Sequence, residues 1–485
     1  MSAPVVPNVT GGELVASRST RTIPVTDPAT GETLALLPLS SAGELDDTVK
    51  LAAAAQQQWG LTPVKDRVQV LFRFKHLLEQ ATPRLARLIN AENGKTVDEA
   101  AASIARAVEC VEYATSLPQL IAGEVLEVSR GVECRMFRQP LGVVAGIVPF
   151  NFPLMVPLWM VPLALACGNA FVLKPSEQTP LASIELAKLL AEAGLPPGVF
   201  SVVNGDREIV EAICDHPLIQ AIGFVGSSKV ARLVYERGIL SGKRVRALGG
   251  AKNHLIVVPD ADPEMTAANV TASVTGCAGQ RCMAASVLVA VGEVDHILAK
   301  IREKMAAIVP GRDMGPVISR SALERISSYI ERAPTTGGKI LLDGRSASSV
   351  GPAGGNFIGA SMIEVTSPSH ESACDEIFGP VLTVLRCATL DQALAIEGAN
   401  PYGNAAAIYT SSGRAAQYFT ERANAGMIGV NVGVPVPREP FPFGGWNLSR
   451  FGEGDITGRG AIDFWTVAKK VTTKWSGEHS TNWMS

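Results

Sequence analysis

The spacing of apolar residues changes along the chain and divides it into regions. From Val64 to Ala81, and again from about Val97 to Thr115, apolar residues recur at helical spacing, which predicts two helices after a strand-like entry. From Gly142 onward, short β-rich runs alternate with helical runs, in the order GVVAGIV, PLMVPLWMVPLALA, AFVLK, ASIELAKLLAEA, FSVVN, REIVEAICD and AIGFVGS. Strand, helix and strand at that spacing predict a parallel, doubly wound sheet.

A second alternating series begins near Lys252 and predicts a second α/β domain. It comprises HLIVV, a helix ending near Gly279, SVLVAV, HILAKIREKMAAI, PVLTVLR and AAAIYTS. Two further segments, Glu133 to Gln139 and Phe464 to Trp475, alternate in β fashion, so we expect a small third sheet that is suited to subunit contact. The most loop-like internal stretch runs from 337 to 355.

Length and composition predict a large globular protein. The chain has 485 residues, 47% of them apolar and 18% charged, which is enough for two or more packed units. A net charge of −3, without an extended Lys/Arg cluster, argues against a nucleic-acid partner.

Targeting, membrane and metal signals are weak. No basic region followed by an apolar run opens the chain, so we expect a cytoplasmic protein. Prolines and polar residues interrupt the apolar stretch from 141 to 173, which argues against a membrane span. The eight cysteines form no CxxC pair and the six histidines have no ligand spacing, so we expect reduced thiols and no metal site.

One cysteine is a candidate nucleophile. Cys282 follows a helix-terminating, Gly-containing segment and lies beside Arg281, where a thiolate would be favoured and the pKa would fall below about 8.5. A cysteine inside a cell is more often a small buried apolar residue, and we interpret Cys277 in that way.

Polar residues follow three predicted parallel strands, at the sheet edge where α/β enzymes place their sites. Asn151, in PFNFP, could donate to an oxyanion or simply satisfy its own turn. The segment from Lys174 to Glu177 offers a cation and a carboxylate for a ribose diol, or is a solvated loop. Gly226 and Ser227 open a helix whose N–H groups suit a pyrophosphate, unless Ser227 only caps that helix. No GxGxxG follows any strand.

Together these segments resemble the aldehyde dehydrogenase superfamily over nearly the whole chain. The motifs occur in the order PFNFPL, LKPSEQTP, GFVGS, LGG, GQRC, EIFGPV and PFGGWNLS. Within the superfamily, ALGGAKNH, GQRCMA and PFNFPLMVPLWMVPLA are similar to the CoA-acylating methylmalonate-semialdehyde dehydrogenases. The resemblance implies an α/β fold with a Rossmann-like cofactor domain, an α/β catalytic domain and a small β oligomerisation domain.

The resemblance also implies roles for individual residues. Cys282 would attack an aldehyde, and Asn151 with the backbone N–H of Cys282 would hold the oxyanion while hydride passes to NAD. The implied cofactor-binding residues are Phe150, Lys174, Ser176, Glu177, Gly226, Ser227, Glu376 and Phe378. A carboxylate at Glu177 favours NAD over NADP. Ala231 replaces a glycine found in many relatives, which puts the packing of the local helix in question.

Ala247 is the most informative departure from the superfamily. Hydrolytic members have a glutamate there that activates water, and a methyl group cannot act as a base. Because a thiol ionises more readily than water, coenzyme A needs less help as acyl acceptor. The CoA-acylating subfamily shows the same loss.

Two arginines match those that the subfamily uses to hold a substrate carboxylate. They are Arg106, which would otherwise be a surface helix residue, and Arg281, for which the sequence alone favours no role. The expected entrance loop carries Arg438 and Glu439, more charge than is typical, so specificity could differ; surface solvation is the simpler explanation.

The resemblance gives the following expectations for organisation and activity. The NAD-binding domain would comprise residues 1–118 and 140–247, the catalytic domain 248–455, and the oligomerisation domain 119–139 and 456–485 of a dimer or tetramer. The activity would be NAD- and CoA-dependent oxidation of malonate semialdehyde or methylmalonate semialdehyde to acetyl-CoA or propionyl-CoA with decarboxylation. The alternatives are a hydrolytic dehydrogenase with a substitute base and a non-catalytic family member.

Overall fold

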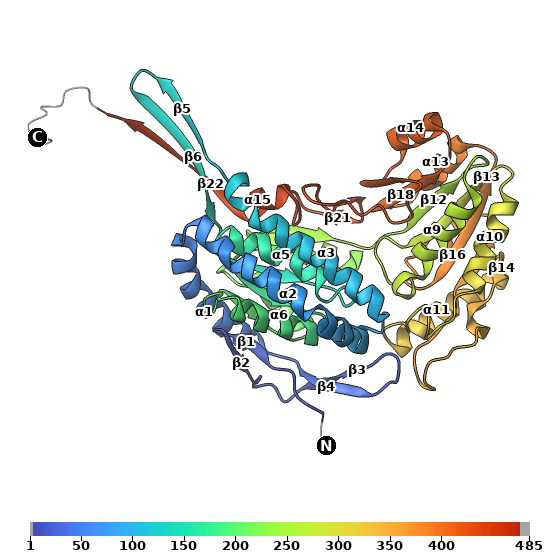
Figure 1. Cartoon of the computed structure of the whole chain (residues 1–485), viewed down its shortest axis with the longest axis horizontal. Coiled ribbons are helices and arrows are strands. Elements are labelled where there is room, and N and C mark those ends of the chain that lie inside the picture. Colours follow the sequence, from blue (N-terminus) through green and yellow to red (C-terminus); the bar gives the residue numbers. More distant parts are fainter. Residues whose placement is uncertain (1–2, 476–485) are drawn as a thin grey trace, which may run out of the picture.

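The computed structural model describes residues 3–475 and contains two α/β bodies side by side, with a narrow arm projecting from the first (Figure 1). The first sheet has eight strands in the order β2 (Glu13–Val15), β1 (Asn8–Thr10), β9 (Phe200–Val202), β8 (Ala170–Lys174), β7 (Val143–Ile147), β10 (Ile219–Val225), β11 (Arg244–Leu248) and β21 (Arg450–Phe451). The strands from β9 to β11 are parallel, and those at both edges are antiparallel. Because successive strands depart from β7 in opposite directions, the sheet is doubly wound.

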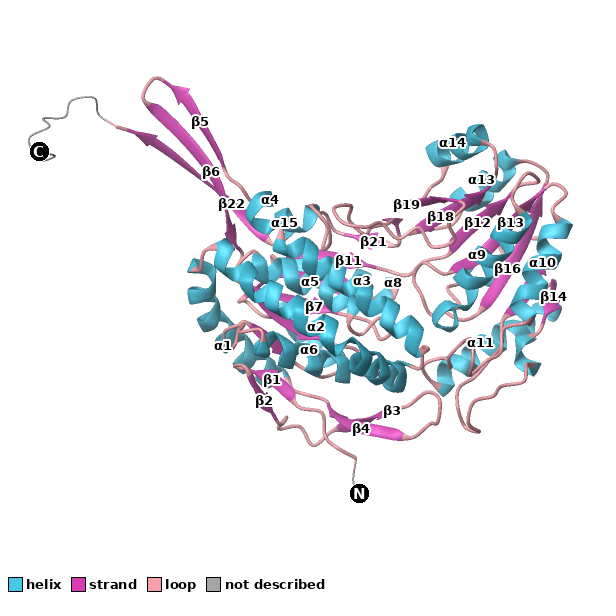
Figure 2. Cartoon of the chain, viewed as in Figure 1, coloured by secondary structure: helices cyan, strands magenta, loops and turns pink. Residues whose placement is uncertain are grey.

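Helices cover both faces of this sheet (Figure 2). One apolar cluster joins one face to α1 (Ala42–Leu61), α7 (Arg207–Asp215) and α8 (Ser228–Leu240). Another joins the opposite face to α2 (Val64–Asn93), α3 (Val97–Thr115), α5 (Met155–Ala166) and α6 (Leu181–Glu192). Along β7, Val143 and Ala145 belong to the first cluster and Val144 to the second. A strand buried on both faces must be apolar throughout, which explains the uninterrupted run GVVAGIV.

The second sheet has the same construction. Its seven strands lie in the order β14 (Gly338–Leu342), β15 (Ser361–Val365), β16 (Val381–Cys387), β13 (Ala285–Val291), β12 (Asn253–Val257), β18 (Ala405–Tyr409) and β19 (Met427–Val430). Only the edge strand β14 is antiparallel. One face packs on α9 (Pro263–Thr275) and α10 (Asp295–Ala306), the other on α11 (Arg320–Arg332), α13 (Leu390–Gly398) and α14 (Gly413–Arg422).

The arm is a three-stranded antiparallel sheet that extends away from both bodies (Figure 1). Its central strand β6 (Val132–Pro140) pairs with β5 (Glu124–Ser129) on one side and β22 (Thr466–Lys474) on the other. Five of its apolar side chains are exposed, which are Val125, Leu126, Val128, Phe137 and Val467. The two β-like segments of the sequence therefore pair with each other as expected.

The remaining elements are short. They are β3 (Thr22–Thr26), β4 (Thr33–Pro38), α4 (Leu117–Leu120), α12 (Glu371–Cys374), β17 (Tyr402–Gly403), β20 (Trp446–Asn447), α15 (Gly460–Phe464) and the 3-10 turns Gly276–Gly279, Ala333–Thr335 and Gly344–Ser346. Among the described residues, no helix is both long and apolar enough to cross a membrane.

Two of the predicted segments differ from the structure. The helix predicted from Val64 to Ala81 is α2, which continues through Pro83 and ends at Asn93 because Gly94 takes a left-handed φ of 89°. The stretch from 337 to 355 is not all loop, since it contains β14, an edge strand without the apolar alternation of a half-buried strand. The division into three domains remains a prediction, and its residues 1–2 and 476–485 lie outside the described part.

Trp465 connects the base of the arm to the first body. It is fully buried, and its ring centroid lies 4.6 Å from that of Phe464 and 6.0 Å from that of Phe171. Asn169 donates through Nδ2 to its carbonyl oxygen at 2.9 Å.

We expect Trp465→Ala to lower the free energy of unfolding by about 3–5 kcal/mol, because the cavity it leaves cannot close completely. Urea denaturation of the variant measures this loss. Trp446→Ala is the control, since that side chain is 48% exposed and its loss should cost below about 0.5 kcal/mol. Equal destabilisation by both substitutions would contradict the assigned role.

Candidate functional site

The site lies where the carboxyl edge of the first sheet faces the amino edge of the second. Asn151 follows β7 and Ser227 follows β10, on either side of the point where the strand order reverses. In the second body, Cys282 lies three residues before β13 begins, and Phe378 lies three residues before β16 begins. A cavity of about 720 Å³ separates the two edges. Among its lining residues are Phe150, Asn151, Lys174, Ser176, Glu177, Gly226, Ser227, Cys282, Glu376 and Phe378.

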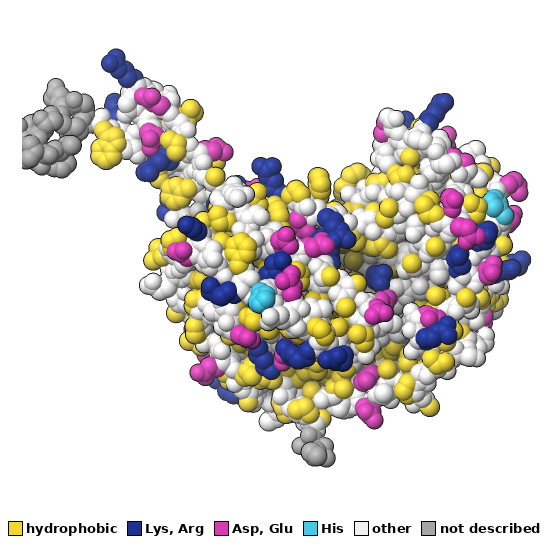
Figure 3. Space-filling view, in the orientation of Figure 1, with side chains coloured by type: hydrophobic (Ala, Val, Ile, Leu, Met, Phe, Trp, Pro, Cys, Tyr) yellow, Lys and Arg dark blue, Asp and Glu magenta, His cyan; other side chains and the backbone are white. Residues whose placement is uncertain are grey.

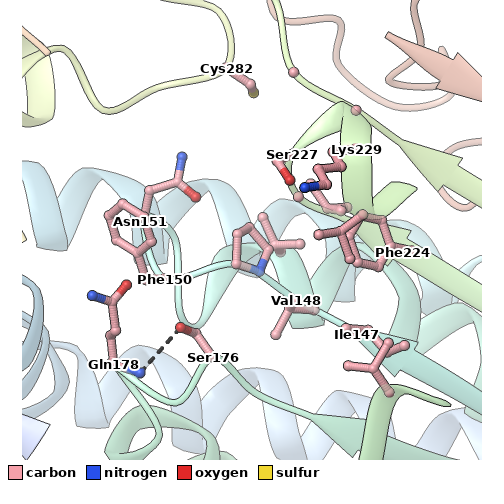
Figure 4. A pocket seen from close by; sticks show the side chains of 18 of the residues that line it. Ile147, Val148, Phe150, Asn151, Ser176, Gln178, Phe224, Ser227, Lys229 and Cys282 are labelled. Carbon is pink, nitrogen blue, oxygen red and sulfur yellow. Dashed lines mark hydrogen bonds between the residues drawn. The ribbon is translucent and has the colours of Figure 1, made fainter. Parts of the chain in front are cut away.

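The amide of Asn151 extends toward the side of the cavity on which Cys282 lies (Figure 4). Its Nδ2 donates to the carbonyl oxygen of Gln280 at 2.9 Å, which uses one of the two amide hydrogens. Lys95 donates through Nζ to the Asn151 carbonyl oxygen at 2.6 Å and holds the backbone of this loop. The second amide hydrogen of Asn151 can therefore serve an oxygen atom bound near Cys282.

A second asparagine fixes the loop that carries the cysteine. Asn253 donates through Nδ2 to the carbonyl oxygens of Cys282 at 2.8 Å and Ala284 at 2.9 Å. Its Oδ1 accepts from the N–H of Ala405 at 3.1 Å. Neither Asn253 nor Lys95 was predicted from the sequence. A signal existed for Asn253, because it is the polar residue that immediately precedes the apolar run HLIVV.

Gly279 brings the cysteine loop against the loop of Glu376 and Phe378. Its φ is 72°, and a Cβ at this position would lie 2.2 Å from the carbonyl oxygen of Gly379. Only glycine permits both the left-handed backbone and this close approach. Across the cavity, the Phe150 and Phe378 rings meet edge to face with centroids 5.9 Å apart.

The pKa of the Cys282 thiol is higher than its sequence neighbour Arg281 predicts. Burial and, to a lesser extent, the charge of Glu376 raise the pKa of the thiol to about 12, because backbone N–H groups and Arg281 oppose these effects only in part. The expectation of a lowered pKa is wrong for this state of the enzyme. The physical reason is that Arg281 is paired with Glu99, so its attraction for the thiolate is smaller than the effect of desolvation on the thiol.

The far end of the cavity offers groups for a ribose and a pyrophosphate. Lys174 donates through Nζ to Glu177 at 3.0 Å, and although burial opposes ionisation, this partner holds the pKa of Glu177 below its usual value. Ser227 precedes α8, and its hydroxyl makes no capping bond to that helix, so it is not the simple cap that the sequence allowed. Figure 4 shows Ser227 and Lys229 at the start of α8. Ala231 is fully buried in the apolar cluster, so the helix accommodates the missing glycine.

Glu376 lines the same cavity as Cys282, and its negative charge opposes ionisation of that thiol. Its Oε1 accepts from the N–H of Ala251 at 2.9 Å, and a Cβ on Gly250 would lie 2.2 Å from its Oε2. Burial raises the pKa of Glu376, and the Ala251 N–H and Lys252 only partly offset this. The carboxylates among the lining residues are Glu177, Asp206 and Glu376.

The two predicted carboxylate anchors, Arg106 and Arg281, are not among the residues that line this cavity. Arg281 donates through Nη2 to Glu99 at 3.0 Å, and its side chain lines a separate hollow with Glu99. Arg106 donates through Nη1 to Glu439 at 2.7 Å and to Glu109 at 2.8 Å. Each guanidinium therefore already has a carboxylate partner within the chain.

Ala247 is fully buried in β11, between Phe224 of β10 and Phe451 of β21. It does not line the cavity, and no carboxylate takes its place at this position in the strand. All eight cysteines are free thiols, and within residues 3–475 no cluster of three His, Cys, Asp or Glu side chains could hold a metal ion.

Comparison with known proteins agrees with this geometry. The model of the aldehyde dehydrogenase family matches residues 14–471. Malonate-semialdehyde dehydrogenase 1 of Geobacillus kaustophilus is 46% identical to the chain over 477 residues, which are 97% of this chain and 98% of that protein.

Two solved structures are similar over nearly their whole length. A Sinorhizobium meliloti protein complexed with NAD, proposed to be a methylmalonate-semialdehyde dehydrogenase, superposes with a TM-score of 0.97 at 41% identity, covering 98% of this chain and 99% of that one. The methylmalonate-semialdehyde dehydrogenase of Oceanimonas doudoroffii superposes with a TM-score of 0.95 at 42% identity and the same coverage. The expected fold class is confirmed, and the chain belongs to the aldehyde dehydrogenase family.

Proposed function

We propose that the chain oxidises malonate semialdehyde or methylmalonate semialdehyde with NAD and transfers the acyl group to coenzyme A, with loss of carbon dioxide. The observation that carries the proposal is the cavity that combines Cys282 and Asn151, together with an alanine in place of a base at position 247 of β11. The names and the nearly full-length similarity of the relatives support the choice of substrate.

The cavity fits a dinucleotide. Glu177 would accept hydrogen bonds from the two hydroxyls of the adenosine ribose, and a carboxylate there would repel a 2′-phosphate, which favours NAD over NADP. The uncommitted hydroxyl of Ser227 and the first N–H groups of α8 would hold the pyrophosphate. Glu376 and Phe378 would contact the nicotinamide end, beside Cys282. When bound, NAD supplies the acceptor for the hydride.

The first half-reaction would depend on Cys282 and Asn151. The sulfur, after losing its proton, attacks the aldehyde carbon, and the second amide hydrogen of Asn151 with the N–H of Cys282 stabilises the oxyanion. Loss of hydride from the same carbon leaves a thioester on Cys282. A carboxylate β to the thioester carbonyl can then leave as carbon dioxide, because the resulting carbanion is stabilised as an enolate.

The second half-reaction would select a thiol over water. A thiol has a pKa of about 8.5, whereas that of water is about 15.7, so a thiol ionises without a dedicated base. The cavity offers no carboxylate at position 247 to compensate for the weak acidity of water. Coenzyme A is therefore the proposed acceptor, and acetyl-CoA or propionyl-CoA the product.

We also infer a homo-oligomer, a dimer or a tetramer, that forms through the arm. Apolar side chains of β5, β6 and β22 are exposed on a thin sheet that has no body packed against it, and Figure 3 shows several of them at the surface of the arm. Such a sheet is best explained by burial against a second copy. A cytoplasmic location and the absence of a nucleic-acid partner remain predictions.

Cys282→Ala should abolish NADH formation and preserve NAD binding, because the groups for the cofactor belong to other segments. Cys277→Ala is the matched control. Cys277 is buried, its Sγ contacts Asn93 and it does not line the cavity, so that variant should retain most of the activity. Stopped-flow NADH absorbance and NAD titration measure the two effects. Equal loss of activity in both variants would disprove the assignment of the nucleophile.

The raised pKa of Cys282 predicts a specific pH dependence. Because a pKa of about 12 leaves the thiol protonated at neutral pH, the reactive thiolate fraction of the cofactor-free enzyme should rise about tenfold per pH unit from pH 7 to 10. Alkylation by iodoacetamide, followed by mass spectrometry of the Cys282 peptide, measures this slope. A rate that levels off below pH 8 would show a lowered pKa instead.

The absence of a base at Ala247 predicts a burst. Without coenzyme A, the enzyme should form one NADH per active site and then turn over slowly; coenzyme A should restore steady turnover with one acyl-CoA per NADH. Chromatography of the products distinguishes thioester from free acid. Ala247→Glu should increase the share of free acid. Rapid turnover to free acid without coenzyme A would favour the hydrolytic alternative, with Glu376 the first substitute base to replace.

A further inference from the structure

Arg106 of α3 is held by a carboxylate of the same chain. Its Nη1 donates to Oε2 of Glu439 at 2.7 Å, and its Nη2 donates to the carbonyl oxygen of Pro437 at 3.1 Å. The side chains of Arg106 and Glu439 are only 14% and 10% exposed. Water therefore screens this ion pair weakly, and its geometry is more constrained than that of a surface pair.

The ion pair lies next to the reaction cavity. Arg106 and Glu439 line a narrow space together with Trp159 and Phe443. Trp159 also lines the large cavity that contains Cys282. A group that extends from an aldehyde at Cys282 past Trp159 would therefore meet the Arg106 guanidinium and the carboxylate that occupies it.

Glu99, the carboxylate partner of the other arginine, has more hydrogen-bond partners within the chain than Glu439 has. Glu99, which pairs with Arg281, also accepts from the N–H and hydroxyl of Thr96 and from the N–H of Cys277. It belongs to the capping box that begins α3. The Glu439 carboxylate accepts hydrogen bonds from Arg106 and from the Cys110 thiol. Glu439 also lies in residues 431–445, which form neither helix nor strand.

We propose that Glu439 is a specificity-determining residue whose carboxylate occupies Arg106 and competes with the acid group of the substrate for that guanidinium. An acidic aldehyde must displace Glu439 to use Arg106, whereas a neutral aldehyde gains nothing from the displacement. The chain therefore discriminates less between acidic and neutral aldehydes than it would with an uncharged residue at 439. This inference rests on the proposed function in its choice of malonate semialdehyde as the acidic substrate.

Glu439→Gln tests the competition, because it keeps the size of the side chain and removes the charge. The measurement is the ratio of kcat/KM for malonate semialdehyde to kcat/KM for propanal, which has the same number of carbon atoms and no acid group. We expect this ratio to rise at least about tenfold, as a charged competitor for Arg106 is lost. In Glu439→Gln/Arg106→Gln the rise should disappear. NADH formation with propanal reports that each variant is folded.

Glu109→Gln is the matched control. Glu109 contacts the same Nη1 atom of Arg106 at 2.8 Å, but its side chain is 42% exposed and also pairs with Arg438. Because solvent screens that contact, the ratio should change less than about twofold. An unchanged ratio in Glu439→Gln, a rise that persists without Arg106, or an equal rise in Glu109→Gln would overturn the proposal.

Failure of the proposed function would give a different pattern. If the wild-type chain forms no acyl-CoA from any aldehyde, the CoA-acylating function is wrong. The preference for malonate semialdehyde over propanal can still be compared between wild type and Glu439→Gln from NADH formation in the first half-reaction. If wild type does not oxidise malonate semialdehyde and Glu439→Gln does, the competition is supported and the substrate assignment is not.

Discussion

The site depends on satisfying the buried backbone of the cysteine loop. Residues 279–284 lie between two bodies, where water does not reach most of their polar atoms, and an unpaired buried carbonyl is costly. Asparagine side chains from both bodies supply the missing donors: Asn151 bonds to Gln280, and Asn253 bonds to Cys282 and Ala284. The position of Cys282, the proposed nucleophile, therefore follows from hydrogen bonds that the loop needs in order to be buried at all.

The same constraint connects the two sheets. Asn151 is positioned by β7 of the first sheet, and Asn253 begins β12 of the second, so one short loop bonds to both bodies. Gly279 adds a steric requirement, because its contact with Gly379 brings the loop of Glu376 and Phe378 to the same place. Groups from two separate sheets thereby line a single cavity, with the groups proposed for the ribose and pyrophosphate on the first sheet and Cys282 on the second.

The sequence predicted most of the parallel strands that frame the site, because those strands follow a local apolar pattern. The motifs of the resemblance supplied twelve candidate site residues, and ten of them line one cavity. Strand runs such as GVVAGIV are apolar throughout, and Asn151 or Ser227 is placed by the strand it follows. Long-range pairing has no such signal. Arg281 meets Glu99, 182 residues away, and Arg106 meets Glu439, 333 residues away. The error in the pKa of Cys282 arose in the same way, since a charge nearby in sequence was already paired in space.

These pairings suggest how the site separates its two half-reactions. Beside the cysteine, Arg281 is paired with Glu99, and its positive charge only partly offsets the burial that keeps the thiol protonated. A site of this kind keeps its nucleophile protonated until a bound ligand changes the local electrostatics, which limits side reactions of an exposed thiolate. After acylation, the proposed acceptor must ionise by its own acidity, because position 247 carries alanine and not a base. In the proposed mechanism, the absence of an unpaired cation beside the thiol delays its ionisation, and the acidity of the incoming thiol, rather than a base of the enzyme, directs the acyl group to coenzyme A.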